Sequence, residues 1–142
     1  MMTLKNVKLL HKNTHVGILI LRLSIGILML LHGIHKLLHG VGFIAQMVAG
    51  AHLPPFFVYG VYVGEVIAPL LLIVGYKTRI AALIYAFNCL VAALLAHWGS
   101  LFALSEQGGW NVELLGLYFF GAVALVFTGG GKYACSSKSI FD

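Results

Sequence analysis

Charged residues are scarce in this chain. They make up 9% of the 142 residues, and only four of them are acidic. About a quarter of the residues of a soluble globular domain are usually charged. Hydrophobic residues account for 61% of the chain. This balance excludes an ordinary soluble fold and is typical of a protein embedded in a lipid bilayer.

Cysteine is also scarce. The chain has two cysteines, Cys89 and Cys135, and no C-x-x-C motif. It therefore lacks a dithiol for a redox relay and a cysteine set for an iron–sulfur cluster. A strand followed by Rossmann-type glycines is missing as well. We expect that the protein does not carry electrons by itself, and we interpret Cys89 as a small packing residue.

Long apolar runs are what the sequence does contain. A membrane-spanning helix needs about 20 apolar residues, and four runs approach or exceed this length, at 16–38, 56–76, 80–98 and 111–129. The first run resembles a signal peptide, but it is too long and no small-residue cleavage site follows it. We therefore predict an all-α, integral membrane four-helix bundle that forms a single domain over 1–142.

The positive residues predict how this bundle is oriented. The loops 39–55 and 99–110 contain no lysine or arginine. By the positive-inside rule, we predict a multi-pass protein of the bacterial inner membrane with both termini in the cytoplasm. The positive charges are spread over short segments, so we expect no nucleic-acid partner. These residues are Lys5, Lys8, Lys12, Lys77, Arg79, Lys132 and Lys138.

The two outer loops differ in character. In the loop 39–55, Phe43, Met47 and Ala51 repeat every four residues, which predicts a short helix in the outer membrane interface. In the second outer loop, Trp98 and Trp110 are expected to act as interface anchors.

Small residues predict where the helices pack, because they let helix backbones approach closely in a membrane. Pro69 is expected to kink the second helix about one turn beyond Glu65. Asn88 is expected to bridge helices through a hydrogen bond. The small residues with the expected spacing are Gly60, Gly64 and Ala68 on the second helix, Ala82, Ala86 and Ala93 on the third, and Gly116 and Gly121 on the fourth.

Two opposite charges lie inside the predicted hydrocarbon layer. At a rise of about 1.5 Å per residue, Arg22 lies roughly 9 Å and Glu65 roughly 16 Å from the cytoplasmic ends of their helices. An unpaired charge at such depth costs at least about 3 kcal/mol. We therefore predict an Arg22–Glu65 pair, which either fixes helix register or takes part in ligand binding.

Three more ionisable residues reach one depth near the outer surface. His32, His97 and Glu113 all lie at roughly 24–26 Å by the same rise, and they come from three different helices. Lys36 follows one turn further out. We predict that His97, Glu113 and His32 form a catalytic layer and that Lys36 helps to bind a ligand, because ionisable groups inside membranes are usually functional. The alternative for Lys36 and His39 is that they snorkel to the interface.

Histidines also suggest metal or haem binding. His32, His35 and His39 share one stripe of the first helix, but no carboxylate or thiolate accompanies them at helical spacing, so we predict no metal site. His32 and His97 are arranged suitably for a bis-histidine haem, although two histidines alone are a weak signal.

The order of these motifs resembles the DoxX family, which includes DoxD-like and MauE-like proteins. The stretch "RLSIGILMLLHGIHKL" is similar to the opening of that family, and "GEVIAPLLLIVGYKTRIAAL" is similar to its second signature. His97 at the end of the third helix and Glu113 at the start of the fourth also match. The tail "GGGKYACSSKSIFD" is similar to the family's ending, but extra residues precede Asp142, so no role is carried over to that aspartate.

The resemblance implies a small four-helix inner-membrane protein associated with redox processes. Relatives have been linked to a thiosulfate:quinone oxidoreductase, to methylamine dehydrogenase maturation and to oxidative-stress complexes. Our first interpretation is an accessory subunit that binds a quinone or another small molecule and works with a redox partner protein. The alternative is a proton-linked transporter or assembly factor without catalytic activity. A transporter of this size is expected to dimerise, with Gly60 and Gly64 as the candidate contact.

Overall fold

The computed structural model describes residues 13–142 and shows an all-α protein. The four predicted apolar helices are confirmed, and each begins and ends within a few residues of its predicted bounds. The bounds of the elements are α2 Thr14–His39, α3 Gly42–Gly50, η1 Pro55–Tyr59, α4 Gly60–Tyr62, η2 Val63–Ile67, α5 Ala68–Val74, α6 Thr78–His97, η3 Trp98–Ser100 and α7 Glu113–Thr128.

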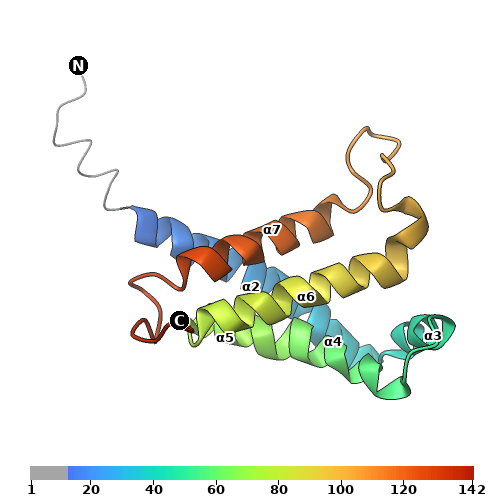
Figure 1. The fold of residues 1–142 in the computed structure, drawn as a ribbon, viewed down its shortest axis with the longest axis horizontal. Helices are drawn as coiled ribbons and strands as arrows, with labels where there is room; N and C mark the ends of the chain where they lie inside the picture. Colours follow the sequence, from blue (N-terminus) through green and yellow to red (C-terminus); the bar gives the residue numbers. More distant parts are fainter. Residues whose placement is uncertain (1–12) are drawn as a thin grey trace.

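The long helices run along one axis of the molecule (Figure 1). The start of α2, the α5–α6 turn and the C-terminal tail lie at one end, while α3 and the loop after η3 lie at the other. The helical segments Thr14–His39, Pro55–Val74 and Thr78–Ser100 are each long and apolar enough to cross a membrane. The 16 residues of α7 span only about 24 Å, which is shorter than the hydrocarbon core of about 30 Å.

The second membrane helix is continuous but changes its winding. It begins as the 3-10 turn η1, and its middle, Val63–Ile67, is π-helical. There the backbone N–H of Ala68 donates to the carbonyl of Val63, five residues earlier. Pro69 follows directly and has no N–H to give to the carbonyl of Glu65. The irregularity expected at Pro69 therefore takes the form of a widened turn that contains Glu65.

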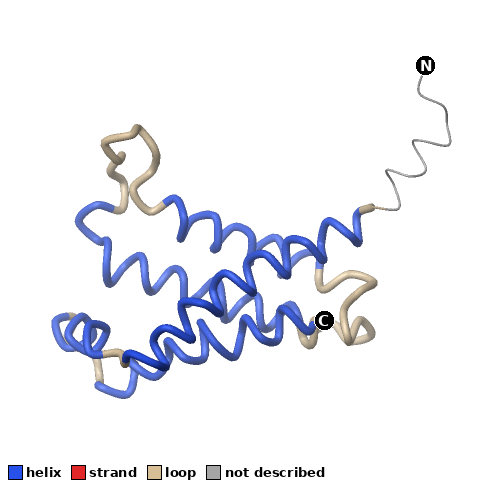
Figure 2. Tube along the Cα trace, turned by 180° about the vertical axis from the view of Figure 1, so that it is seen from behind, coloured by secondary structure: helices blue, strands red, loops and turns tan. Residues whose placement is uncertain are grey.

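The core lies around α6, which packs against both α5 and α7 (Figure 2). Tyr85 of α6 is fully buried, and its hydroxyl donates to the backbone carbonyl of Ile25 in α2 over 2.8 Å. The alanines predicted to face the bundle, Ala82, Ala86 and Ala93, are all buried. Leucines of α5 and α7 complete the core at Leu72 and Leu125.

The short helix predicted in the first outer loop is confirmed as α3. It packs against η1, with Val48 almost fully buried. Phe43 on the same helix is 71% exposed. The side chain of Phe43 is therefore free to enter the membrane interface, as expected for an interfacial helix.

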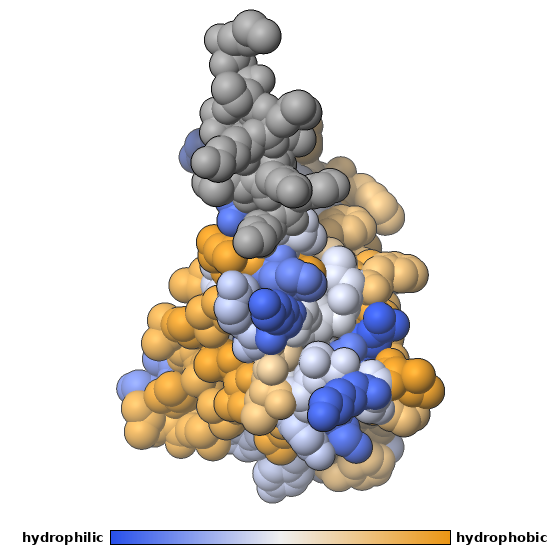
Figure 3. All heavy atoms as spheres, turned by 90° about the vertical axis from the view of Figure 1, so that its left-hand side faces the viewer, coloured by the Kyte–Doolittle hydropathy of each residue, from blue (hydrophilic) through white to orange (hydrophobic). Residues whose placement is uncertain are grey.

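The end of the molecule that holds the C-terminal tail carries hydrophilic residues. Figure 3 looks onto this end and shows them gathered on its face, with hydrophobic residues along the flanks. The exposed basic residues here are Lys77, Arg79, Lys132 and Lys138. The predicted cluster Lys5, Lys8 and Lys12 lies outside the described residues. An apolar wall with a polar end is the surface expected of a membrane-spanning bundle.

Candidate functional site: a buried arginine and a lysine–glutamate ion pair

The predicted Arg22–Glu65 pair is wrong. Arg22 is 1% exposed, and its guanidinium points toward the C-terminal tail rather than toward Glu65. One terminal nitrogen donates to the carbonyl of Gly130 over 2.8 Å, and the other donates to the carbonyl of Tyr133 over 3.2 Å. The prediction relied on an extended arginine side chain reaching the level of Glu65, but the same side chain can equally reach backbone carbonyls on the side of the tail.

The C-terminal tail folds back over the turn between α5 and α6. The backbone N–H groups of Cys135 and Ser136 donate to the carbonyls of Val74 and Gly75. Gly75 has φ +78°, and a Cβ at this position would collide with the Arg22 guanidinium and lie 2.7 Å from the Cα of Ala134. Glycine is therefore required here both for the left-handed backbone and for the close approach of the tail.

Asp142, for which no role was predicted, completes this arrangement. Its carboxylate accepts hydrogen bonds from the N–H of Ser139 over 2.7 Å, the hydroxyl of Ser136 over 2.8 Å and the N–H of Lys77 over 3.2 Å. These bonds, led by that of Ser139, lower the pKa of Asp142 below its ordinary value. The Nε of Arg79 also donates to the backbone carbonyl of Asp142. Asp142 thus fastens the tail to the start of α6.

Glu65 has a different partner, Lys36 of α2. The Lys36 Nζ and the Glu65 Oε2 form a hydrogen-bonded ion pair, the only salt bridge among residues 13–142. The side chain of Glu65 is 8% exposed and that of Lys36 is 26% exposed. The carboxylate is therefore nearly enclosed, while the ammonium can still be reached from outside the bundle. Both residues were predicted to bind a ligand, but they were not predicted to bind each other.

Gly33 makes this pair possible. A Cβ at Gly33 would collide with the carbonyl oxygen of Glu65 and lie 2.7 Å from both the Glu65 carbonyl carbon and the Cγ2 of Val66. The two helices therefore touch backbone to backbone at this level. Side chains on a helix point toward its N-terminus, so Lys36 extends back over the turn of Gly33 and reaches Glu65.

We call the contact line between α2 and the second membrane helix (η1 to α5) the seam. It continues from Gly33 toward the tail. Gly26 lies seven residues before Gly33, and a Cβ there would lie 3.3 Å from the carbonyl oxygen of Pro69 and 2.9 Å from Ile73. A spacing of seven returns to the same helix face after two turns. Two glycines of α2 therefore allow the two helices to approach closely along the seam, where the ion pair forms.

The outer layer of His32, His97 and Glu113 is not drawn together by hydrogen bonds or ion pairs in the described part of the chain. The ring of His32 is exposed and meets that of Tyr118 edge to face, with centroids 6.5 Å apart. Glu113 is exposed and lies beside Gly109 of the preceding loop. Equal depth along separate helices does not fix which way each side chain points. The catalytic roles of these three residues stay predictions.

The remaining histidines of α2 lie near its outer end. The rings of His35 and His39 stack with centroids 4.2 Å apart, and Nδ1 of His39 lies 3.0 Å from the carbonyl oxygen of His35. Within residues 13–142, no three histidine, cysteine, aspartate or glutamate side chains come together as a metal site.

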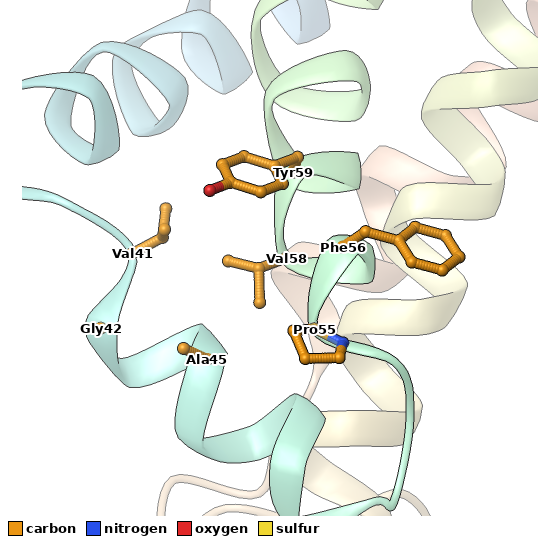
Figure 4. Close-up of a pocket in the computed structure, with 7 residues that line it drawn as sticks. All are labelled: Val41, Gly42, Ala45, Pro55, Phe56, Val58 and Tyr59. Atoms are coloured by element: carbon orange, nitrogen blue, oxygen red, sulfur yellow. The ribbon is translucent and has the colours of Figure 1, made fainter.

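A shallow groove of about 410 Å³ lies between α3 and η1, at the end of the molecule away from the tail (Figure 4). Its walls are apolar except for Tyr59, whose hydroxyl points away from η1 toward the side of Val41. Tyr59 precedes Glu65 by six residues, which is roughly 9 Å along a helix. The residues that line the groove are Val41, Gly42, Ala45, Pro55, Phe56, Val58 and Tyr59.

The expected packing roles of Gly64 and Asn88 also need correction. Gly64 is buried against the side chain of Asn88, so it does not offer a free face for a second copy, whereas Gly60 is exposed. Asn88 forms no hydrogen bond with the described residues and so does not bridge the helices as predicted. At this point α6 contacts the π-helical turn through van der Waals packing of the Asn88 side chain, not through a hydrogen bond.

These observations define a small multi-pass helical membrane protein with a buried ion pair between its first two membrane helices. The chain belongs to the DoxX family, whose model matches residues 17–98. The match includes Arg22, Lys36 and Glu65, but it ends before α7 and the tail. The expected likeness of Glu113 and of the tail to the family therefore stays a prediction. No curated protein and no solved structure matches this chain.

Sequence reasoning missed the bonds between Arg22 and the tail and the pairing of Lys36 with Glu65. A signal for the second was available, because Gly26 and Gly33 share a helix face with a spacing of seven. For the first, the run of three glycines at 129–131 indicated backbone that can approach another group closely, but it did not identify that group.

Proposed function

We propose that this DoxX-family protein is an accessory membrane subunit of a redox process, and that it binds a quinone at the seam between α2 and the second membrane helix. The observation that carries the proposal is the Lys36–Glu65 ion pair. An ion pair this deep in an apolar helix pair is costly to maintain and marks a functional site by default. A π-helical turn, such as the one that contains Glu65, is also frequently found at functional sites.

The pair has the chemistry that a quinone requires. The Lys36 ammonium donates hydrogen bonds and can point one of them at a quinone carbonyl while another remains on Glu65. His32, one turn inward on the same helix, adds an imidazole that can donate or accept a hydrogen bond. Reduction to the quinol consumes two electrons and two protons. The electrons come from a partner redox protein, and the protons pass through these side chains from water at the membrane surface.

The groove between α3 and η1 gives such a ligand an entrance. It opens at the outer end of the same seam, and its lining is mainly apolar, as small-molecule sites usually are. We place the quinone ring between this groove and Lys36, with its isoprenoid tail in the lipid. In this arrangement Tyr59 supplies the second hydrogen-bonding group at the groove.

The same proposal includes the orientation. The start of α2 and the tail lie at one end of the bundle (Figure 1), and the exposed basic residues of the described chain gather there. By the positive-inside rule this end faces the cytoplasm of a bacterium, which puts the Lys36 site in the outer half of the inner membrane.

Quinone binding is tested with an azidoquinone that carries a short tail. Purified protein in lipid nanodiscs is illuminated with the probe, digested and analysed by mass spectrometry. We expect labelling of α2 and of the segment from η1 to η2, and we expect Lys36→Met to weaken binding at least about tenfold, as the loss of a hydrogen bond to a charged group predicts. The matched control is Lys132→Met at the other end of the bundle, which should bind like the unaltered protein.

Two results would overturn the proposal. One is the absence of specific labelling in the unaltered protein, and the other is equal labelling in Lys36→Met. In either case, proton flux into liposomes becomes the decisive measurement for the alternative of a proton-linked transporter. That alternative requires flux that depends on Lys36 and Glu65.

A further inference from the structure

The side chain of Asn88 occupies an unusual position in the membrane. It follows Thr78, the first residue of α6, by ten residues, which is roughly 15 Å along the helix and about half of the hydrocarbon thickness. Asn88 is half-buried, and its side chain covers Gly64, where an added Cβ would collide with the amide. The amide is not enclosed by the protein and has no hydrogen-bond partner among residues 13–142.

An amide in this position lacks the partners that it requires. A primary amide has two N–H donors and a carbonyl acceptor. Hydrocarbon offers neither a donor nor an acceptor, so leaving the group unpaired at this depth is unfavourable. Amide side chains in membrane helices commonly satisfy themselves by hydrogen bonding across a helix–helix contact. The contact between α6 and η2 therefore requires a polar partner from outside residues 13–142.

We propose that the partner is a second copy of this chain, placed by a two-fold axis that passes close to Asn88. A two-fold interface brings each residue near the axis opposite its own copy. A primary amide is complementary to itself, since the N–H of one copy donates to the carbonyl of the other. The two Asn88 side chains thus satisfy each other without any further polar residue.

The surroundings of Asn88 allow another helix to come close. Gly60 lies one turn outward from Gly64 on the same helix face, and the space where its Cβ would stand is open. On α6, the small residue Ala92 lies one turn beyond Asn88. Small residues at such a contact let two backbones approach closely. Lys36 reaches Glu65 from α2, whereas Asn88 meets Gly64 from α6. The proposed ligand site and the proposed dimer contact therefore involve different neighbours of the second membrane helix.

Dimerisation is measured in vesicles of phosphatidylethanolamine and phosphatidylglycerol by single-molecule photobleaching, over a series of protein-to-lipid ratios. We expect two-step bleaching for the unaltered protein, with about tenfold weaker association for Asn88→Leu, as the loss of interhelical hydrogen bonds predicts. Asn88→Gln should restore most of the association, because it returns the amide. Leu83→Ala is the control, since Leu83 is 61% exposed and lies about 140° away on α6.

Cysteine cross-linking tests the same interface without altering Asn88. In protein that carries Cys135→Ser, Ala92→Cys should form a disulfide between two copies on mild oxidation, and Leu83→Cys should not. Cys89 can remain, because it is almost fully buried. A monomer at every protein-to-lipid ratio, undiminished dimers of folded Asn88→Leu, or equal cross-linking at the two positions would each overturn the proposal. None of these results would affect quinone binding, which is measured separately.

Discussion

Gly33 of α2 lies against the backbone carbonyl of Glu65, so closely that no other residue fits between the two helices. Pro69 leaves that carbonyl without its usual N–H donor four residues later. The absence of one side chain and one N–H group therefore brings the two backbones together, and the Lys36–Glu65 ion pair forms beside this contact.

Gly33→Ala tests this contact. The added methyl group must push the helices apart, and we expect it to lower the free energy of unfolding by about 1–3 kcal/mol, the usual effect of overpacking. Unfolding in detergent mixtures, followed by circular dichroism, measures the change. Gly17→Ala on the same helix is the matched control, because a Cβ there meets nothing within 4 Å. The control should be neutral, or more stable by up to about 1 kcal/mol. Equal effects of the two substitutions would contradict the proposed contact.

Lys36→Met tests the ion pair. Removal of one partner leaves the carboxylate of Glu65 buried alone, and we expect a loss of about 3 kcal/mol in the free energy of unfolding. The double variant Lys36→Met with Glu65→Gln has no buried charge at this position and should recover a large part of that loss. The four proteins of this double-mutant cycle are compared in the same detergent. Additive losses would show that the two side chains do not interact.

Arg22→Leu should loosen the tail and leave the Lys36–Glu65 pair in place. The carbonyls of Gly130 and Tyr133 lose a charged donor, and such a hydrogen bond contributes about 1.5–3 kcal/mol. We therefore expect hydrogen exchange of the Cys135 and Ser136 amides to become roughly tenfold to a hundredfold faster. Exchange at α3, at the other end of the bundle, serves as the internal reference. Unchanged protection of the tail would show that Arg22 does not hold it.

Acid should release the tail through Asp142. The hydrogen bonds from Ser139, Ser136 and Lys77 lower the pKa of its carboxyl in the folded protein. A lowered pKa stabilises the folded state at pH values above the ordinary aspartate value, and this contribution is lost as the pH falls through the lowered pKa. Protection of the Ser136 amide, corrected for intrinsic exchange, should therefore fall in this acidic range. Asp142→Asn should show reduced protection at neutral pH and a flat response, whereas the same acid transition in this variant would assign the effect to another group.

His97→Ala and Glu113→Gln test the outer layer. Glu113 is exposed, His97 is partly exposed, and no hydrogen bond or ion pair of these side chains with other described residues is observed. We expect each substitution to change the free energy of unfolding by no more than about 0.5 kcal/mol, as for surface positions. If either residue acts in catalysis, the substitution should abolish quinone turnover with the redox partner and leave azidoquinone labelling intact. A large loss of stability would instead assign the residue to the scaffold.

The arrangement of the membrane helices could be predicted because it depends on local properties. Apolar run length indicated the four helices, and the spacing of Phe43, Met47 and Ala51 indicated α3. The partners of the charged residues could not be predicted in the same way. Depth along a helix says nothing about how the helix is rotated or how far a long side chain reaches. Lys36 and Arg22 both extend to groups at other depths.

The burial of three charged residues could be predicted from the sequence, whereas their bonding partners could not, and their ligand-binding roles stay predictions. Lys36, Glu65 and Arg22 were selected because ionisable groups are rare inside membranes, and the structure places all three in buried or partly buried positions. The bonds of Arg22 join positions more than 100 residues apart in the sequence, and they end on backbone carbonyls, which have no signature in the sequence. The role of Asp142 depends on the same tail fold, so it could not be predicted from the sequence either.

The bond from Arg22 to Gly130 also has a consequence for biosynthesis. A chain emerges from the ribosome from its N-terminus onward, so Arg22 enters the membrane long before Gly130 and Tyr133 have been made. During that interval its guanidinium has none of its final partners, and α2 can complete its packing only after α7 and the tail arrive. A polypeptide truncated after α7 would thus retain in α2 a buried cation without its hydrogen-bond acceptors.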